Sequence, residues 1–160
     1  MVSSRVSSGG EELLKEVVAV LTAKILRPNV ITASGFILLK QHEDGDFRVL
    51  GLLQPGGYDT TKGHLEAGEM PLEGAIREAH EEASIDDVAM PWGERTLLIN
   101  TLLLYVGLTQ RDGKIKPNPE TGELEHMRVR WMTFDEAKLR FHDFLIPAVE
   151  WAEKIVLGGM

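Results

Sequence analysis

Apolar residues gather along the chain in short runs that predict a β-sheet. Two runs, ITASGFILL at 31–39 and FRVLGLL at 47–53, flank the polar turn HEDGD, an arrangement typical of a β-hairpin. A longer run, TLLINTLLLYVGL at 96–108, predicts a further strand. MRVRWMTF at 127–134 alternates apolar and basic residues, which also predicts a strand because side chains alternate between the faces of a sheet. The apolar face of this last strand comprises Met127, Val129 and Trp131.

Other segments predict helices and the connections between them. REAHEE at 77–82 lies in a predicted helix, because small or apolar residues recur on one side of it. DEAKLRF at 135–141 opens a second helix. The helix is predicted to start again at Pro147, since proline is tolerated in the first helical turn. A glycine-rich loop at 54–64 leads toward the first of these helices. A polar, turn-rich connection at 111–126 is of the kind that carries function between rigid elements. These elements predict an α/β fold, a mixed β-sheet with helices on its faces.

The first part of the chain differs from the rest. A Ser/Gly-rich start precedes EELLKEVVAVLTAKIL at 11–26, whose apolar residues have helical spacing and which ends before Pro28. We predict an N-terminal extension with a helix at residues 1–28 and a single domain at residues 29–160. Two interpretations of the helix stay open. It either packs on the body of the domain or has a function of its own, as a family-specific cap or as a dimer contact that would make the protein a homodimer.

Charge and composition narrow the classes of function. The chain has 160 residues, and 43% of them are hydrophobic, which suits one globular domain. Its net charge of −8 argues against a broad nucleic-acid-binding surface, so an RNA 5′ end is the one nucleic-acid partner that we consider. An acidic protein can still bind phosphates through metal ions.

The expected compartment follows from three absences in the sequence. The chain has no cysteine, which excludes disulfides and thiolate metal sites and fits a reducing cytosol. No apolar run reaches the length of a membrane span. The start of the chain lacks the apolar core of a signal peptide. We therefore expect a cytoplasmic protein with no membrane partner.

The segment 63–85, GHLEAGEMPLEGAIREAHEEASI, carries the strongest chemical signal. Glu78 and Glu82 are four residues apart and Glu81 lies between them, so a helix places three carboxylates on one face. Clustered like charges destabilise a helix, and a hard divalent cation relieves them. Mg²⁺ prefers carboxylate oxygens and takes substrate phosphates as remaining ligands. We therefore predict a metal–phosphate site, with Mg²⁺ as the cofactor and Mn²⁺ as an alternative.

This segment resembles the signature of the Nudix hydrolases. That signature runs Gly, five residues, Glu, seven residues, Arg-Glu, an apolar residue, any residue, Glu-Glu, any residue, Gly and an apolar residue. The matching positions are Gly63, Glu69, Arg77, Glu78, Ala79, Glu81, Glu82 and Ile85. Ser84 stands where the family usually has glycine, which adopts left-handed helix ends at low cost. The resemblance implies a Nudix-type α/β/α sandwich with a mixed β-sheet.

Within that family, the chain is similar to the asymmetric diadenosine tetraphosphate hydrolases. The similar stretches are ASGFILLK, YDTTKGHLEAGE and GELEHMRVRWMTFDEA, and they cover the chain from about Ala33 onward. One region departs from the resemblance, because those enzymes carry tyrosine and lysine around the strand that follows the signature helix. Here WGERTLLINTLLLY contains no lysine, and Arg95 is its only cation. Lys114 and Lys116, in the polar connection, are alternative sources of positive charge.

The resemblance implies roles for single residues. The predicted metal ligands are Gly63 (through its carbonyl), Glu78, Glu81, Glu82 and Glu125. One of Glu81 and Glu82 also serves as general base, because bound metal lowers the pKa of water enough for an ordinary carboxylate to finish its deprotonation. Glu125 closes the metal shell or acts as base. Arg77 completes the catalytic set by orienting a glutamate. The alternative, a merely solvated helix face, is the interpretation we favour for Glu69 or Glu73 taken alone.

Four residues are predicted to bind substrate, and Phe144 is a further candidate. Lys62 precedes the signature glycine, where a point charge can meet phosphate oxygens. His64 either hydrogen-bonds a phosphate or shapes the loop. Tyr58 and Phe141, like Phe144, are candidates to stack on adenine, since aromatic faces accept any base. Aromatic residues at helical spacing are more often core, and that alternative applies to all three.

The predicted activity is Mg²⁺-dependent hydrolysis of a nucleoside polyphosphate, and the resemblance implies diadenosine tetraphosphate as substrate with ATP and AMP as products. A 5′-pyrophosphohydrolase acting on RNA ends uses the same signature, as do enzymes for other nucleoside-diphosphate-linked substrates. The net charge of −8 speaks against RNA. A non-catalytic Nudix module that senses nucleotides is an alternative of another class. Its usual sign is loss of the signature glutamates, and all are present here.

Overall fold

The computed structural model describes residues 10–17 and 31–158. The chain forms two units, residues 1–30 and 31–160, which are considered separately. In the first unit residues 10–17 are helical, with their side chains exposed. The rest of the helix predicted at 11–26 lies outside the described residues. Its role and the predicted boundary after residue 28 stay predictions.

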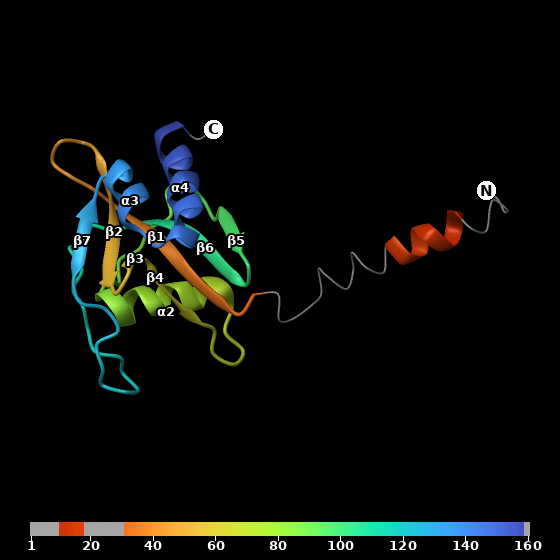
Figure 1. The fold of residues 1–160 in the computed structure, drawn as a ribbon, viewed down its shortest axis with the longest axis horizontal. Coiled ribbons are helices and arrows are strands. Elements are labelled where there is room, and N and C mark those ends of the chain that lie inside the picture. Colours follow the sequence, from red (N-terminus) through yellow and green to blue (C-terminus); the bar gives the residue numbers. More distant parts are fainter. Residues whose placement is uncertain (1–9, 18–30, 159–160) are drawn as a thin grey trace. The chain divides into compact units, whose positions relative to one another are not determined.

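A seven-stranded mixed sheet forms the centre of the second unit (Figure 1). Its strands are β1 (Ala33–Gln41), β2 (Phe47–Gln54), β3 (Gly57–Asp59), β4 (Thr61–His64), β5 (Thr96–Ile99), β6 (Leu102–Leu108) and β7 (Val129–Met132). β1 is central, since it pairs in parallel with β6 and antiparallel with both β2 and β4. The predicted hairpin is confirmed, with Leu39 of β1 opposite Val49 of β2.

Helices cover both faces of this sheet. α2 (Pro71–Ala83) lies on one face, and α3 (Phe134–Arg140) and α4 (Ile146–Gly158) lie on the other (Figure 1). Phe36 and Leu38 of β1 belong to the core beneath α2, whereas Ile37 and Leu39 belong to the core beneath α3 and α4. All four side chains are fully buried, which explains the unbroken apolar run of β1. The predicted α/β/α sandwich is confirmed. Among the described residues no helix is long and apolar enough to cross a membrane.

The predicted single strand at 96–108 is wrong. It is a hairpin in which β5 pairs antiparallel with β6. The turn contains Asn100, whose φ of 54° is left-handed, a conformation that asparagine tolerates better than most residues. Apolar residues continue on both sides of this turn, so the hydrophobic pattern does not mark it.

The predicted loop at 54–64 is also largely wrong, because it contains β3 and β4. Gly56, with φ of 90°, turns the chain from β2 into β3. β4 then pairs with β1, placing Gly63 opposite Ser34. The signature glycine therefore lies in the sheet rather than in a free loop.

The C-terminal elements follow the prediction with one difference. β7 is shorter than the predicted strand, and Met127 precedes it and is exposed rather than sharing a packed face with Val129 and Trp131. The predicted helix restart is confirmed. α3 ends at Arg140, and Pro147 lies in the first turn of α4.

Candidate active site

Local contacts fix both ends of α2, the helix that carries the glutamates. At its start, the backbone N–H of Met70 donates to Glu73 Oε1 at 2.9 Å, which gives Glu73 a capping role. At its end, Ser84 is left-handed, with φ of 59°. Serine thus occupies the conformation for which glycine is usual, and its N–H still bonds His80 O at 3.0 Å. The departure from the signature leaves the helix end in place.

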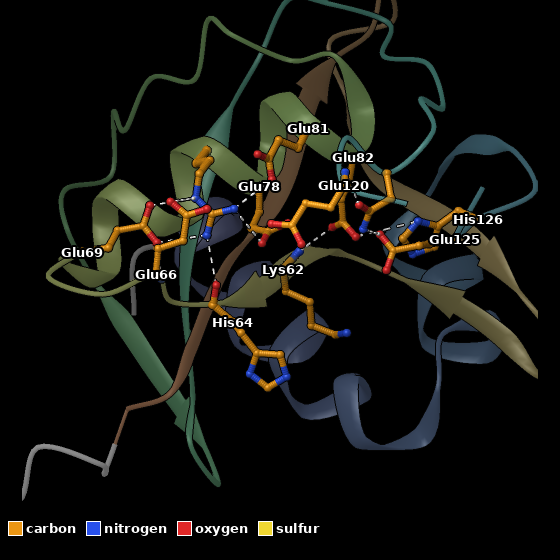
Figure 2. A network of polar contacts seen from close by, with 12 residues as sticks. Lys62, His64, Glu66, Glu69, Glu78, Glu81, Glu82, Glu120, Glu125 and His126 are labelled. Atoms are coloured by element: carbon orange, nitrogen blue, oxygen red, sulfur yellow. Dashed lines mark hydrogen bonds and ion pairs between the residues drawn. The ribbon is translucent and has the colours of Figure 1, made fainter. Parts of the chain in front are cut away.

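Arg77 is the centre of the acidic network on α2 (Figure 2). Its guanidinium donates hydrogen bonds to both carboxylate oxygens of Glu69, at 2.7 and 2.9 Å. Nη1 donates to Glu78 Oε2 at 3.1 Å and to Glu81 Oε1 at 2.8 Å. Nη2 donates to the carbonyl of His64 at 3.0 Å, which ties the helix to β4. These contacts are those of a residue that orients glutamates.

Gly63 and Glu78 lie in direct contact. A Cβ atom added to Gly63 would overlap the carboxylate of Glu78. The two residues come from β4 and α2, which pack against each other. Glycine at this position therefore leaves the space in which the Glu78 carboxylate sits.

Glu82 lies deeper than the other glutamates of the α2 face, with its side chain only 10% exposed. Its Oε1 accepts a hydrogen bond from the backbone N–H of Lys62 at 2.8 Å. Its Oε2 lies 3.9 Å from Nδ1 of His126. Glu82 is therefore held from two sides by β4 and by the end of the polar connection.

A buried polar cluster beside Glu82 has no counterpart in the sequence prediction. His126 is 4% exposed, and its Nε2 lies 3.4 Å from Oδ2 of Asp59, which is 2% exposed. Gln54 Nε2 lies 3.3 Å from the same imidazole nitrogen. Asp59 and Gln54 sit on β3 and β2, 67 and 72 residues away from His126, so no local spacing links them. Polar residues inside the predicted loop at 54–64 are the one sequence signal that could have pointed to this cluster.

Burial changes the acidity of these groups. It raises the pKa of Glu82 to about 9, and the nearby charges of Glu78 and Asp59 act in the same direction. Burial likewise raises the pKa of Glu78 to about 7. Burial also disfavours the charged form of Asp59, but the hydrogen bond with His126 and the charge of Lys62 outweigh it and hold that pKa below its usual value. Burial therefore disfavours the ionised forms of Glu78 and Glu82, and the charge of Arg77 offsets this only in part at Glu78.

These shifts predict a pH dependence of stability in metal-free buffer. The folded-state pKa of Glu82 lies above the unfolded value of 4.5. The contribution of Glu82 to the free energy of unfolding is therefore fully present below about pH 4.5 and is lost as the pH rises toward about 9. Glu78, Asp59, Lys62 and His126 are the titratable groups that face it. Relative to a Glu82→Gln variant, wild-type protein in EDTA should lose thermal stability between about pH 5 and pH 9. Parallel melting profiles of the two proteins across that range would contradict this expectation.

A cavity of about 340 Å³ brings the α2 face together with the polar connection. Its lining includes Glu78, Glu81, Glu82, Lys62, Gly63, His64, Lys116 and Glu125. Glu125 comes from the far end of the connection, and its Oε2 accepts a hydrogen bond from Asn118 Nδ2 at 3.1 Å. The structure therefore places Glu125 in the same cavity as the signature glutamates of α2.

A second cavity of about 360 Å³ shares part of that lining and adds an aromatic ring. Phe144 lines it and is 47% exposed. Tyr58 and Phe141 are 5% and 3% exposed and belong to the core beneath α3 and α4, so the prediction that either stacks on a base is wrong. The alternative, a core role, holds for these two residues and fails for Phe144.

Lys62 and His64 both line the two cavities. Their side chains point away from Glu78, Glu81 and Glu82, which form the glutamate row of α2 (Figure 2). Nζ of Lys62 lies 3.0 Å from Oδ2 of Asp59 and 5.9 Å from the ring centre of Phe144. The carbonyl of His64 holds Arg77, and its ring is exposed. Lys62 is thus positioned between the buried aspartate and the exposed aromatic ring.

The donor set of the first cavity fits a hard divalent cation. Three carboxylates of one helix face and a fourth from the connection line this cavity, and burial raises the pKa of two of them, Glu78 and Glu82. In the arrangement described, Arg77 and the Lys62 N–H engage their oxygens. Within residues 10–17 and 31–158, no three acidic or imidazole groups converge as a ready-made ion site. Metal binding therefore requires these side chains to turn from their present partners.

Solved structures of known proteins share this fold. Among solved structures, a binary complex of a C. elegans Ap4A hydrolase is similar at 21% identity and a TM-score of 0.61, over 79% of this chain and 98% of that one. A Nudix hydrolase from M. smegmatis is similar at 17% identity and a TM-score of 0.60, over 80% of this chain and 86% of that one. The E. coli dihydroneopterin triphosphate pyrophosphohydrolase is similar at 19% identity and a TM-score of 0.58, over 76% of this chain and 96% of that one. At these identities the likeness shows the fold.

The sequence comparisons give the family. No curated protein matches the chain. The model of the NUDIX domain matches residues 19–152, which is most of the chain and includes every signature position. The chain therefore belongs to the Nudix family, whose hydrolases act on acid anhydrides and generally use divalent metal ions.

Proposed function

We propose that this protein hydrolyses the phosphoanhydride chain of a dinucleoside polyphosphate, with diadenosine tetraphosphate cleaved to ATP and AMP. The observation that carries the proposal is the sharing of lining residues by the two cavities. Glu82 and Glu125 line both, so the acidic site opens toward the exposed ring of Phe144. A nucleotide whose base stacks on Phe144 would extend its phosphates toward the carboxylates.

The residues that would hold the metal are Glu78, Glu81, Glu82, Glu125 and the carbonyl of Gly63. A bound Mg²⁺ or Mn²⁺ supplies neutralisation of the phosphate oxygens and acidification of water. Arg77 is the positioning residue, since one guanidinium group orients Glu69, Glu78 and Glu81 together. The general base that takes the proton from the attacking water is Glu81 or Glu82. A water held beside either carboxylate then needs only a short proton transfer.

Lys62 and Phe144 are the proposed substrate contacts. The ammonium group of Lys62 lies between Asp59 and the ring of Phe144, and the Lys62 side chain is 26% exposed. A phosphate next to the base would compete with Asp59 for this ammonium group. The contacts of His64 support a role for its backbone in holding Arg77, and its exposed ring leaves the phosphate role open.

Chelation gives the first test. Purified protein with diadenosine tetraphosphate and Mg²⁺ should release ATP and AMP in equal amounts, and EDTA should reduce the rate to background because four carboxylates cannot accept a polyphosphate without a cation. Product formation is measured by chromatography, and Mg²⁺ or Mn²⁺ added in excess of EDTA should restore it. Turnover that is undiminished in EDTA would remove the metal from the proposal.

A substrate panel separates the proposed activity from its alternatives. It should contain diadenosine tetraphosphate, triphosphorylated RNA and dihydroneopterin triphosphate. The last is included because an enzyme of similar structure is a dihydroneopterin triphosphate pyrophosphohydrolase. The proposal requires the highest kcat/KM on the dinucleoside. Preference for RNA, with a rate that falls steeply as salt rises, would favour RNA-end processing instead. Absence of turnover on every member would favour a nucleotide-sensing role.

A further inference from the structure

Three cationic side chains line the acidic cavity, and two of them are already engaged. Arg77 donates to the carboxylates of Glu69, Glu78 and Glu81. The Lys62 ammonium pairs with Asp59 and points away from the glutamate row (Figure 2). Lys116 is the third, and it forms no ion pair with any carboxylate of the described segments. Lys116 is therefore the cation that this cavity offers to an anionic ligand without breaking an existing pair.

The backbone that leads into Lys116 is anchored by three contacts. The N–H of Lys114 donates to the carbonyl of Ala83, the last residue of α2, at 2.8 Å. The indole of Trp131 donates to the carbonyl of Asp112 at 2.8 Å, and Ile115 packs against the core beneath α2. Lys116 follows directly and is half-buried. The chain just before Lys116 is therefore held against the C-terminal end of α2.

The charge balance of the cavity gives this lysine a function. Six glutamates line it, namely Glu66, Glu78, Glu81, Glu82, Glu120 and Glu125. Metal ions neutralise the phosphates that they touch, but further phosphates of a linear chain would face uncompensated carboxylates. The stretch at residues 92–105 contains no lysine, and Arg95 in that stretch is exposed and lines neither cavity. The positive charge for those further phosphates must come from another element.

We propose that Lys116 binds the phosphates beyond the scissile anhydride, so that the site selects linear chains of three or more phosphates over two-phosphate diesters. A lysine suits this task because its compact charge accepts phosphate oxygens without fixed geometry. The assignment rests on the proposed function, which supplies the scissile anhydride. It separates the two lysines that the sequence left equivalent, because Lys114 is exposed and lines neither cavity.

Steady-state kinetics on two substrates test this selection. Lys116→Ala should lower kcat/KM for diadenosine tetraphosphate by about 10–100-fold, mostly through KM, as expected for loss of one charged hydrogen bond. For diadenosine diphosphate the loss should stay within about threefold, the size of an exposed charge effect. Lys116→Arg should retain most of the tetraphosphate activity. Lys114→Ala, the matched control from the same loop, should behave as wild type on both.

A binding measurement makes the test independent of turnover. Titration calorimetry with the β,γ-methylene analogue of ATP in Mg²⁺ should show weaker binding to Lys116→Ala than to Lys114→Ala, by a similar factor. Equal binding by the two variants, or equal kinetic losses of Lys116→Ala on both substrates, would overturn the role of Lys116. If wild-type protein turns over neither dinucleoside, the proposed function fails, and the calorimetric comparison alone decides whether Lys116 binds phosphates.

Discussion

Replacing Glu82 with glutamine should lower turnover by about 10²–10⁴-fold, the usual effect of losing a positioned acid–base group. Glutamine keeps the size of the side chain, and its amide oxygen can still accept the 2.8 Å hydrogen bond from the N–H of Lys62. The change therefore removes one negative charge while leaving the packing between α2 and β4 intact. A drop in rate would then report on chemistry or metal binding at this carboxylate.

The same substitution should leave the metal-free protein as stable as wild type or more stable. Glu82 is mostly buried, and burial with the charges of Glu78 and Asp59 raises its pKa to about 9. At neutral pH the fold therefore favours a neutral side chain at this position, which glutamine provides. Stabilisation by added Mg²⁺ should shrink, because binding to the native state is what raises apparent stability.

Three measurements on Glu82→Gln decide between a functional and a structural glutamate. They are the rate on diadenosine tetraphosphate, the melting temperature in EDTA, and its rise on adding Mg²⁺. Glu73→Gln is the control from the same helix, since Glu73 caps the N–H of Met70 outside the cavity. It should keep near-normal turnover and full Mg²⁺ stabilisation. The opposite pattern for Glu82→Gln, with lower stability and normal turnover, would remove Glu82 from the proposed site.

The acidic face could be predicted from sequence because it depends on a single helix. Glu78, Glu81 and Glu82 share a face for any α-helix at this spacing, and Arg77 is close enough along the chain to reach its neighbours. The sandwich was predictable for a similar reason. The apolar runs that form β1 and β2 identify strands buried on one or both faces, and the signature segment identifies the helix that covers them.

The buried cluster beside Glu82 could not be predicted in this way. His126, Asp59 and Gln54 meet only because β2, β3 and the end of the polar connection converge in space. As neighbours in sequence, Glu125 and His126 resemble an ordinary surface pair, yet one lines the cavity and the other is buried. Burial of Tyr58 is likewise a property of the sheet, since it depends on the pairing of β3 with β2.

Replacing Gly63 with alanine should lower turnover by about 10²-fold or more, because displacing a reacting group by about 1 Å is enough for a loss of that size. An added Cβ would overlap the carboxylate of Glu78, which is the flexible end of a side chain. That carboxylate must move, whereas the backbone around Gly63 need not. The expected result is a folded protein whose Glu78 no longer reaches its present position.

Gly35 provides the contrasting variant in the neighbouring strand. A Cβ at Gly35 would overlap the backbone carbonyl of Thr61, which cannot move without disturbing the pairing of β1 with β4. Gly35→Ala should therefore reduce thermal stability in EDTA, while Gly63→Ala should leave it near the wild-type value. This difference separates a lost fold from a displaced functional group.

A double-mutant cycle tests whether Gly63→Ala acts through Glu78. If it does, Gly63→Ala should add little to the loss already caused by Glu78→Gln, because both changes remove the same carboxylate from the site. Turnover is measured for the two single variants, the double variant and wild type, and each melting temperature is recorded in EDTA and in Mg²⁺. Additive losses would mean that Gly63 acts by another route, such as its own carbonyl. In that case the contact between Gly63 and Glu78 would not explain why the signature requires glycine at the edge of the site.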